Sequence, residues 1–144
     1  MPTSRLPAAL AADANVVLAA LIGGRASIVF RHADAPPVFA ADLVRLEIVE
    51  WLPKLASKRR LDLGLLLAAL ELLPITWADV AVYERFEGEA RRRMRQRDEA
   101  DWPTVALALA LGESRITSIW SNDKDFSVSG LDAITTGDLL DALK

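Results

Sequence analysis

The sequence predicts a single α/β domain over residues 1–144, a three-layer α/β/α sandwich with a mostly parallel central sheet. The chain is long enough for one domain with its own hydrophobic core. Apolar residues make up 52% of it, which excludes a disordered chain. Short apolar runs of strand length alternate with segments of helical character, and this alternation indicates a parallel sheet covered by helices on both faces.

Turn and capping residues separate these segments. In chain order we expect strands at residues 7–12, 38–40, 74–76, 115–120 and 132–135, and helices at 14–22, 42–52, 63–72, 78–97 (as one or two), 101–111 and 137–143. Gly23–Gly24 is expected to end the first helix, Pro53 the second, and Gly112 the one that begins at 101. Residues 27–32 fit either a strand or a short helix.

Missing residue types exclude several classes of site. The chain has no cysteine, which excludes disulfides, thiolate nucleophiles and cysteine-ligated zinc. Its one histidine, His32, excludes a histidine-rich zinc site. No apolar run reaches the roughly 18 residues of a membrane span, and Arg5, Asp13 and Asn15 argue against a signal peptide. We therefore expect a cytoplasmic protein without membrane contact, in which oxygen atoms would hold a catalytic Mg²⁺ or Mn²⁺.

Several carboxylates follow predicted strands or begin helices, and most have an ordinary explanation. Asp13 follows the first strand and fits a helix N-cap. Asp101, just before a strongly apolar helix, fits an N-cap as well. Asp123 and Asp125 follow a strand within a sequence typical of turns. Asp98 is interpreted as a solvated group or as one that supports the site from behind.

Glu47 lacks such an explanation. On the helix predicted around it, its neighbours one turn away include Val44 and Trp51. A carboxylate on an apolar face is costly unless it is paired or binds a metal. Pairing with Arg45 or Arg5 is the alternative to metal binding.

The residues alone predict a divalent-metal site formed by several of these acids. In parallel sheets, ligands bind beyond the carboxyl ends of the strands, which is where the acids after strands lie. Clustered carboxylates raise one another's pKa unless a divalent cation compensates them. Such a cation can activate water and stabilise the leaving oxygen in phosphodiester cleavage.

Four segments resemble the motifs of PIN-domain nucleases, in that family's order and spacing. They are Asp13-Ala14-Asn15-Val16-Val17-Leu18-Ala19-Ala20-Leu21, Leu46-Glu47-Ile48, Arg97-Asp98-Glu99-Ala100-Asp101-Trp102-Pro103-Thr104-Val105-Ala106-Leu107-Ala108 and Trp120-Ser121-Asn122-Asp123-Lys124-Asp125-Phe126. The resemblance implies a PIN-like fold and an Mg²⁺- or Mn²⁺-dependent endoribonuclease. The implied metal ligands are Asp13, Glu47, Asp101 and Asp123, with Asp125 assisting and Ser121 beside the site.

The same resemblance implies partners. Many stand-alone bacterial PIN proteins of this length are VapC-type toxins paired with a small antitoxin. We therefore expect the toxin of a type II toxin–antitoxin pair, an RNA substrate, a cognate antitoxin and a homodimer.

Two basic clusters could contact RNA phosphates, or could be solvated helix faces. One comprises Lys54, Lys58, Arg59 and Arg60, and the other comprises Arg91, Arg92, Arg93, Arg95 and Arg97. Asn15, Ser121, Arg93 and Arg97 are the candidate RNA contacts, and no aromatic stacking motif for a single strand stands out. The net charge of −3 does not decide the question. Of the 20 acidic residues, four are assigned to the site. The other 16 are balanced in number by 17 lysines and arginines, so the rest of the chain is close to neutral.

Three alternatives stay open. Another magnesium-dependent phosphate hydrolase, such as a phosphatase, would want Asp-x-Asp after the first strand, where this chain has Asp13-Ala14-Asn15. A receiver-like signalling domain needs a phosphoacceptor aspartate after a middle strand, and Asp42 fits that position poorly. A non-catalytic PIN-like module would bind RNA or protein only, and the intact set of acids argues against it.

Overall fold

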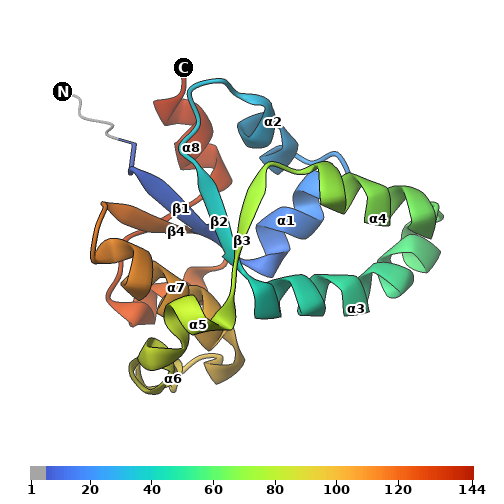
Figure 1. Cartoon of the computed structure of the whole chain (residues 1–144). Coiled ribbons are helices and arrows are strands. Elements are labelled where there is room, and N and C mark those ends of the chain that lie inside the picture. Colours follow the sequence, from blue (N-terminus) through green and yellow to red (C-terminus); the bar gives the residue numbers. More distant parts are fainter. Residues whose placement is uncertain (1–5) are drawn as a thin grey trace.

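The computed structural model describes residues 6–144 and contains a five-stranded, all-parallel sheet flanked by helices (Figure 1). The strands are β1 (Ala9–Ala12), β2 (Val38–Ala41), β3 (Ile75–Ala78), β4 (Thr117–Trp120) and β5 (Ala133–Ile134). The helices are α1 (Ala14–Leu21), α2 (Ala26–Arg31), α3 (Asp42–Arg59), α4 (Leu63–Leu72), α5 (Val80–Tyr83), α6 (Glu87–Met94), α7 (Trp102–Gly112) and α8 (Thr136–Ala142). Short 3-10 turns are η1 (Glu84–Phe86), η2 (Glu99–Asp101) and η3 (Lys124–Ser129). The predicted α/β fold is confirmed.

The strand order β3-β2-β1-β4-β5 places the first strand at the centre of the sheet. The chain moves outward from β1 to β3 and then returns to the other side of β1 as β4. Right-handed crossovers therefore place the helices before β3 on one face and α5, α6 and α7 on the other. The residues of β1, Ala9–Ala12, are fully buried, and α7 packs across β1, β2 and β4.

The order of the strands reverses between β1 and β4, which creates a crevice at their carboxyl ends. Ala12 of β1 lies in register with Trp120 of β4. The backbone N–H of Asp13 donates to the Trp120 carbonyl at 3.2 Å. Asp13 and Ser121, which are 108 residues apart in sequence, are consequently side by side.

Helix α3 is longer than predicted, because it continues through Pro53 to Arg59 instead of ending before the proline. Proline inside a helix costs about 3 kcal/mol through a lost hydrogen bond and a steric clash. Here the buried stripe continues on both sides of it, with Ile48 and Leu52 before and Ala56 after. The helix ends instead at Arg60, whose backbone is left-handed with φ of 55°.

The remaining differences from the predicted elements are local. Residues 27–31 of the ambiguous segment 27–32 lie in helix α2, and the predicted helical region 78–97 divides into α5, η1 and α6. Phe126 is buried and anchors the loop after β4. Within residues 6–144, no helix combines the length and the hydropathy needed to cross a bilayer.

Candidate metal and active site

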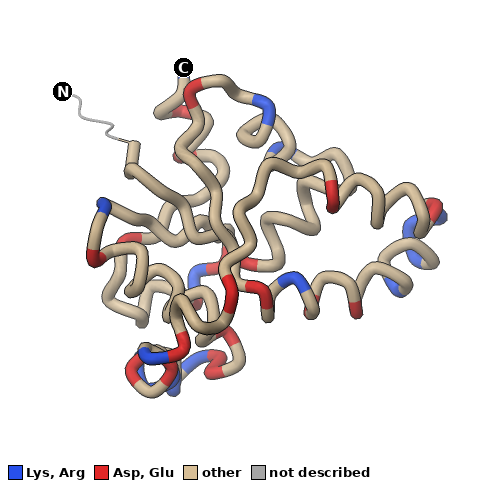
Figure 2. The backbone as a smooth tube through the Cα atoms, in the orientation of Figure 1, with Lys and Arg blue, Asp and Glu red and all other residues tan. Residues whose placement is uncertain are grey.

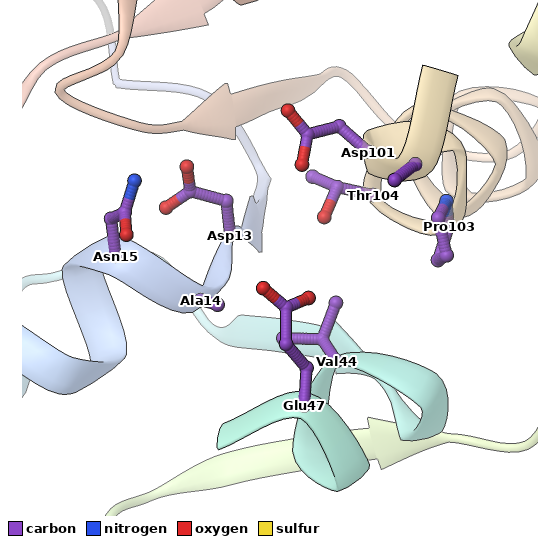
Figure 3. A pocket seen from close by; sticks show the side chains of 9 residues that line it. Asp13, Ala14, Asn15, Val44, Glu47, Asp101, Pro103 and Thr104 are labelled. Carbon is purple, nitrogen blue, oxygen red and sulfur yellow. The ribbon is translucent and has the colours of Figure 1, made fainter. Parts of the chain in front are cut away.

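A small pocket lies at the crevice between the carboxyl ends of the strands. Its lining comes from α1, α3 and the η2–α7 junction: Asp13, Ala14, Asn15, Val44, Glu47, Ala100, Asp101, Pro103 and Thr104. The carboxylates of Asp13, Glu47 and Asp101 point from these three elements toward the same space (Figure 3). Three of the four predicted metal ligands therefore line one pocket.

Asp13 is held rigidly at the end of β1. Its side chain is 6% exposed, and its two oxygens have different partners. Oδ1 accepts from the backbone N–H of Val16 at 3.2 Å, which is an N-cap of α1, and Oδ2 accepts from Ser121 Oγ at 2.6 Å. The pKa of Asp13 is raised to about 6, chiefly by burial and to a smaller extent by the charge of Asp123, against the lowering effect of these hydrogen bonds. Asp13 therefore caps α1 and lines the pocket at the same time.

Asp101 does not cap its helix, contrary to the capping explanation offered for it. Its side chain makes no capping hydrogen bond to α7, whereas Asp98 caps the preceding η2 turn by accepting from the Ala100 N–H at 3.0 Å. The pKa of Asp101 is raised to about 7. Burial is the largest cause, and the next causes are the charges of Asp98, Asp13, Glu47 and Asp123. The carboxylate of Asp101 is therefore available to a ligand.

Glu47 lies at the pocket, but not on the apolar face that the sequence predicts for it. Its side chain is exposed, and the buried stripe of α3 contains Val44 and Ile48 instead. Arg45 pairs with Glu71, so it does not neutralise Glu47, and Arg5 lies outside the described residues. Partial burial raises the pKa of Glu47, and so do the charges of Asp98 and Glu50. Glu47 is an exposed acid that lines the pocket.

Asp123 and Asp125 have different partners. Asp123 does not line the pocket, but its charge raises the pKa of both Asp13 and Asp101, and Ser121 contacts both Asp13 and Asp123. Its N–H donates to Ser121 Oγ at 2.9 Å, and its own Oδ1 accepts from the Asp125 N–H at 2.9 Å. Asp125 pairs with Arg97 at 3.4 Å. The structure thus gives different partners to the acid predicted as a ligand, Asp123, and the acid predicted to assist, Asp125.

Of the four predicted RNA contacts, Asn15 and Ser121 lie at the candidate site, whereas Arg93 and Arg97 form ion pairs. Asn15 is exposed and lines the pocket, and Ser121 is buried against Asp13. Arg93 is held internally, because it donates to the Ser129 carbonyl at 2.5 Å and pairs with Glu89 at 2.6 Å. Together with the Arg97–Asp125 pair, Arg93 fastens η3 onto α6.

Asp98 has a larger electrostatic effect on the site than the sequence predicts. It is the second largest cause, after burial, of the raised pKa of both Glu47 and Asp101. Its position three residues before Asp101 is the signal that could have identified it, because a 3-10 turn places residues three apart on one side.

The donor set fits a hard divalent cation, although the ligands are not drawn together. Within residues 6–144, no three acidic or histidine side chains are arranged closely enough to hold one ion as they stand. Over the same residues, Asp13, Glu47 and Asp101 have no lysine or arginine partner. Oxygen donors without a compensating cation are suited to Mg²⁺ or Mn²⁺.

The sequence from residue 12 to residue 144 matches the family model described as the PIN domain. The chain belongs to the PIN domain family. Its fold is similar to that of a chain in the crystal structure of VapBC2 from Rickettsia felis bound to a DNA fragment from their promoter. That match has a TM-score of 0.66 and 15% sequence identity, and it covers 88% of this chain and 98% of the other. No curated protein matches the sequence. The resemblance to PIN domains is thus confirmed, and the metal ligands of this PIN domain stay a prediction.

Proposed function

We propose that this PIN-domain protein is a metal-dependent endoribonuclease that hydrolyses RNA phosphodiester bonds. The observation that carries the proposal is the convergence of Asp13, Glu47 and Asp101 on one pocket without a basic partner. Their raised pKa values mean that the folded protein bears unfavourable negative charge there, which a bound cation would offset. Membership of the PIN family, whose members are typically nucleases, supports the same activity.

Each acid would have a separate role. Asp13 and Asp101 would hold the cation, with Asp13 kept in position by Ser121 and with Asp123 behind them. Bound Mg²⁺ or Mn²⁺ would supply Lewis-acid stabilisation of the phosphate and lower the pKa of a bound water. Glu47, at the mouth of the pocket, would complete the ligand set or orient the attacking water. Asn15, exposed at the start of α1, would donate its amide to a phosphate oxygen.

The test is cleavage of RNA in the presence of Mg²⁺ or Mn²⁺, with EDTA as the metal-free condition. We expect cleavage by the wild type, and a loss of at least a hundredfold in Asp13→Ala and Asp101→Ala, because each removes a cation ligand. Asp34→Asn is the matched control, since Asp34 is exposed and remote from the pocket. Equal activity in all four proteins would overturn the site. RNA binding without cleavage would favour a non-catalytic module instead.

We also propose that the protein acts in the cytoplasm as a homodimeric toxin neutralised by an antitoxin. Support comes from the likeness of its fold to a chain of the VapBC2 structure and from large apolar side chains left exposed on α3 and α4, among them Leu46, Leu65 and Leu72. Induced expression should arrest growth, and Asp101→Ala should relieve the arrest. A mass measurement in solution that gives only the monomer would contradict the dimer.

A further inference from the structure

A second groove lies between α1 and α3, next to the candidate site. It has a volume of about 350 Å³ and is lined by Leu18, Trp51, Lys54, Leu55 and Lys58. Its floor is apolar and aromatic, and both of its charged residues are lysines. No acidic side chain lines it.

The lining residues of the groove follow those of the candidate site by about one turn along both helices. On α1, Asn15 lines the site and Leu18, three residues later, lines the groove. On α3, Glu47 lines the site and Trp51, four residues later, lines the groove. Residues three and four apart on a helix are neighbours on one face. One face of each helix therefore leads from the acids into the groove.

The face of α3 that carries Glu47 and Trp51 changes from acidic to basic along the helix. Glu47 is followed on the same face by Trp51, Lys54 and Lys58, which span roughly 16 Å from acid to last lysine at 1.5 Å per residue. Figure 2 shows the basic residues gathered at the far end of α3, where it turns into α4. A polyanion leaving the acidic pocket along this helix would pass from negative to positive surface.

Trp51 and the two lysines are available to a ligand. The Trp51 side chain is 51% exposed, and the Lys54 ammonium lies 5.1 Å from the centre of its ring. Throughout the described part of the chain, neither Lys54 nor Lys58 forms an ion pair. An exposed indole beside free lysines combines a stacking surface with phosphate contacts.

We propose that this groove is a subsite for single-stranded RNA, in which a base stacks on Trp51 while Lys54 and Lys58 contact the phosphates beside it. The inference rests on the proposed ribonuclease function and specifies the form of its substrate. Stacking on an aromatic ring tolerates any base, so the subsite would bind and align the strand without choosing its sequence. Lys54 would move from the ring to a phosphate when a base arrives. The succession of acids, indole and lysines along one face of α3, next to the proposed hydrolytic pocket, favours RNA over a protein helix as the occupant.

The experiment measures the affinity of a fluorescent single-stranded RNA of mixed sequence, roughly 12 nucleotides long, across a salt series. All variants carry Asp101→Asn, so that binding is measured without turnover. Trp51→Leu should weaken binding about tenfold, whereas Trp51→Phe should restore most of it, because only Phe offers a ring. Lys54→Gln with Lys58→Gln should lower the slope of log affinity against log salt by about 1.4, the value for two phosphate contacts on a single strand.

Two controls separate the proposal from simpler causes. Ile116→Ala removes an exposed apolar side chain just before β4, and Arg31→Gln removes an exposed charge from α2; neither should change affinity or slope. Equal binding by Trp51→Leu and Trp51→Phe, or an unchanged salt slope in the double lysine variant, would overturn the subsite and leave the groove to a protein partner. Failure of the ribonuclease proposal is distinguishable, because it would appear as absence of cleavage by the wild type.

Discussion

Asp13→Asn should make the metal-free protein more stable at neutral pH. The folded-state pKa of Asp13 is raised to about 6 from 3.8, chiefly by burial. Because the folded-state pKa is raised, the free energy of unfolding is highest below the unfolded pKa of 3.8, where Asp13 is protonated in both states. It falls as pH rises through the folded pKa of about 6, where the buried carboxyl must ionise. At pH 7.5 a shift of about two units corresponds to about 3 kcal/mol, which is an upper limit for the gain from removing the charge. Asparagine retains the N-cap of α1 and can still hydrogen-bond to Ser121.

The assay is thermal unfolding of wild type and Asp13→Asn in EDTA between pH 4 and pH 8. At roughly 2–4 °C per kcal/mol, the variant should unfold several degrees higher at pH 7.5, and the difference should vanish toward pH 4. Mg²⁺ should raise the melting temperature of the wild type more than that of the variant, because only the wild type has the full charge to be compensated. A variant that is equally stable or less stable at pH 7.5, with no dependence on pH, would refute the reasoning.

Three further outcomes are expected. Ser121→Ala should lower the free energy of unfolding by about 1–2 kcal/mol, because it removes a buried donor to Asp13. It should also raise the Mg²⁺ concentration needed for cleavage. Ser127→Ala, which changes an exposed residue, is the control for both measurements. Arg93→Gln should increase the rate of proteolysis within η3, because it releases the Ser129 carbonyl, whereas an equal rate in Arg92→Gln would show that charge alone matters. Pro53→Ala should stabilise the protein by about 1–3 kcal/mol in chemical denaturation, since it restores a backbone donor within α3; a destabilised variant would mean that the helix depends on the proline.

Several features of the site follow from local sequence. Acids that follow apolar strands must lie toward the carboxyl edge of a parallel sheet, so the positions of Asp13 and Asp123 in the sequence are enough to predict that both lie at this edge. The strongly apolar helix after Asp101 had to be buried, which put its first turn at the same edge.

Other features could not be obtained in this way. A helical wheel gives the neighbours of Glu47, but it does not say which of them the rest of the molecule covers; α3 buries Val44 and Ile48 and leaves Trp51 in solvent. Pro53 is a helix breaker by propensity, and its cost is met only by tertiary burial on either side.

The sequence by itself determined the succession of strands and helices, the parallel sheet and the oxygen-only chemistry of any metal site, because these depend on local periodicity and on residue types. The tertiary structure alone decided that β4 lies beside β1, which brings Ser121 onto Asp13, and that Arg97 pairs with Asp125. It also decided that Trp51 is exposed one turn beyond Glu47. These arrangements depend on strand order and on which helix faces are covered, and no local pattern encodes either.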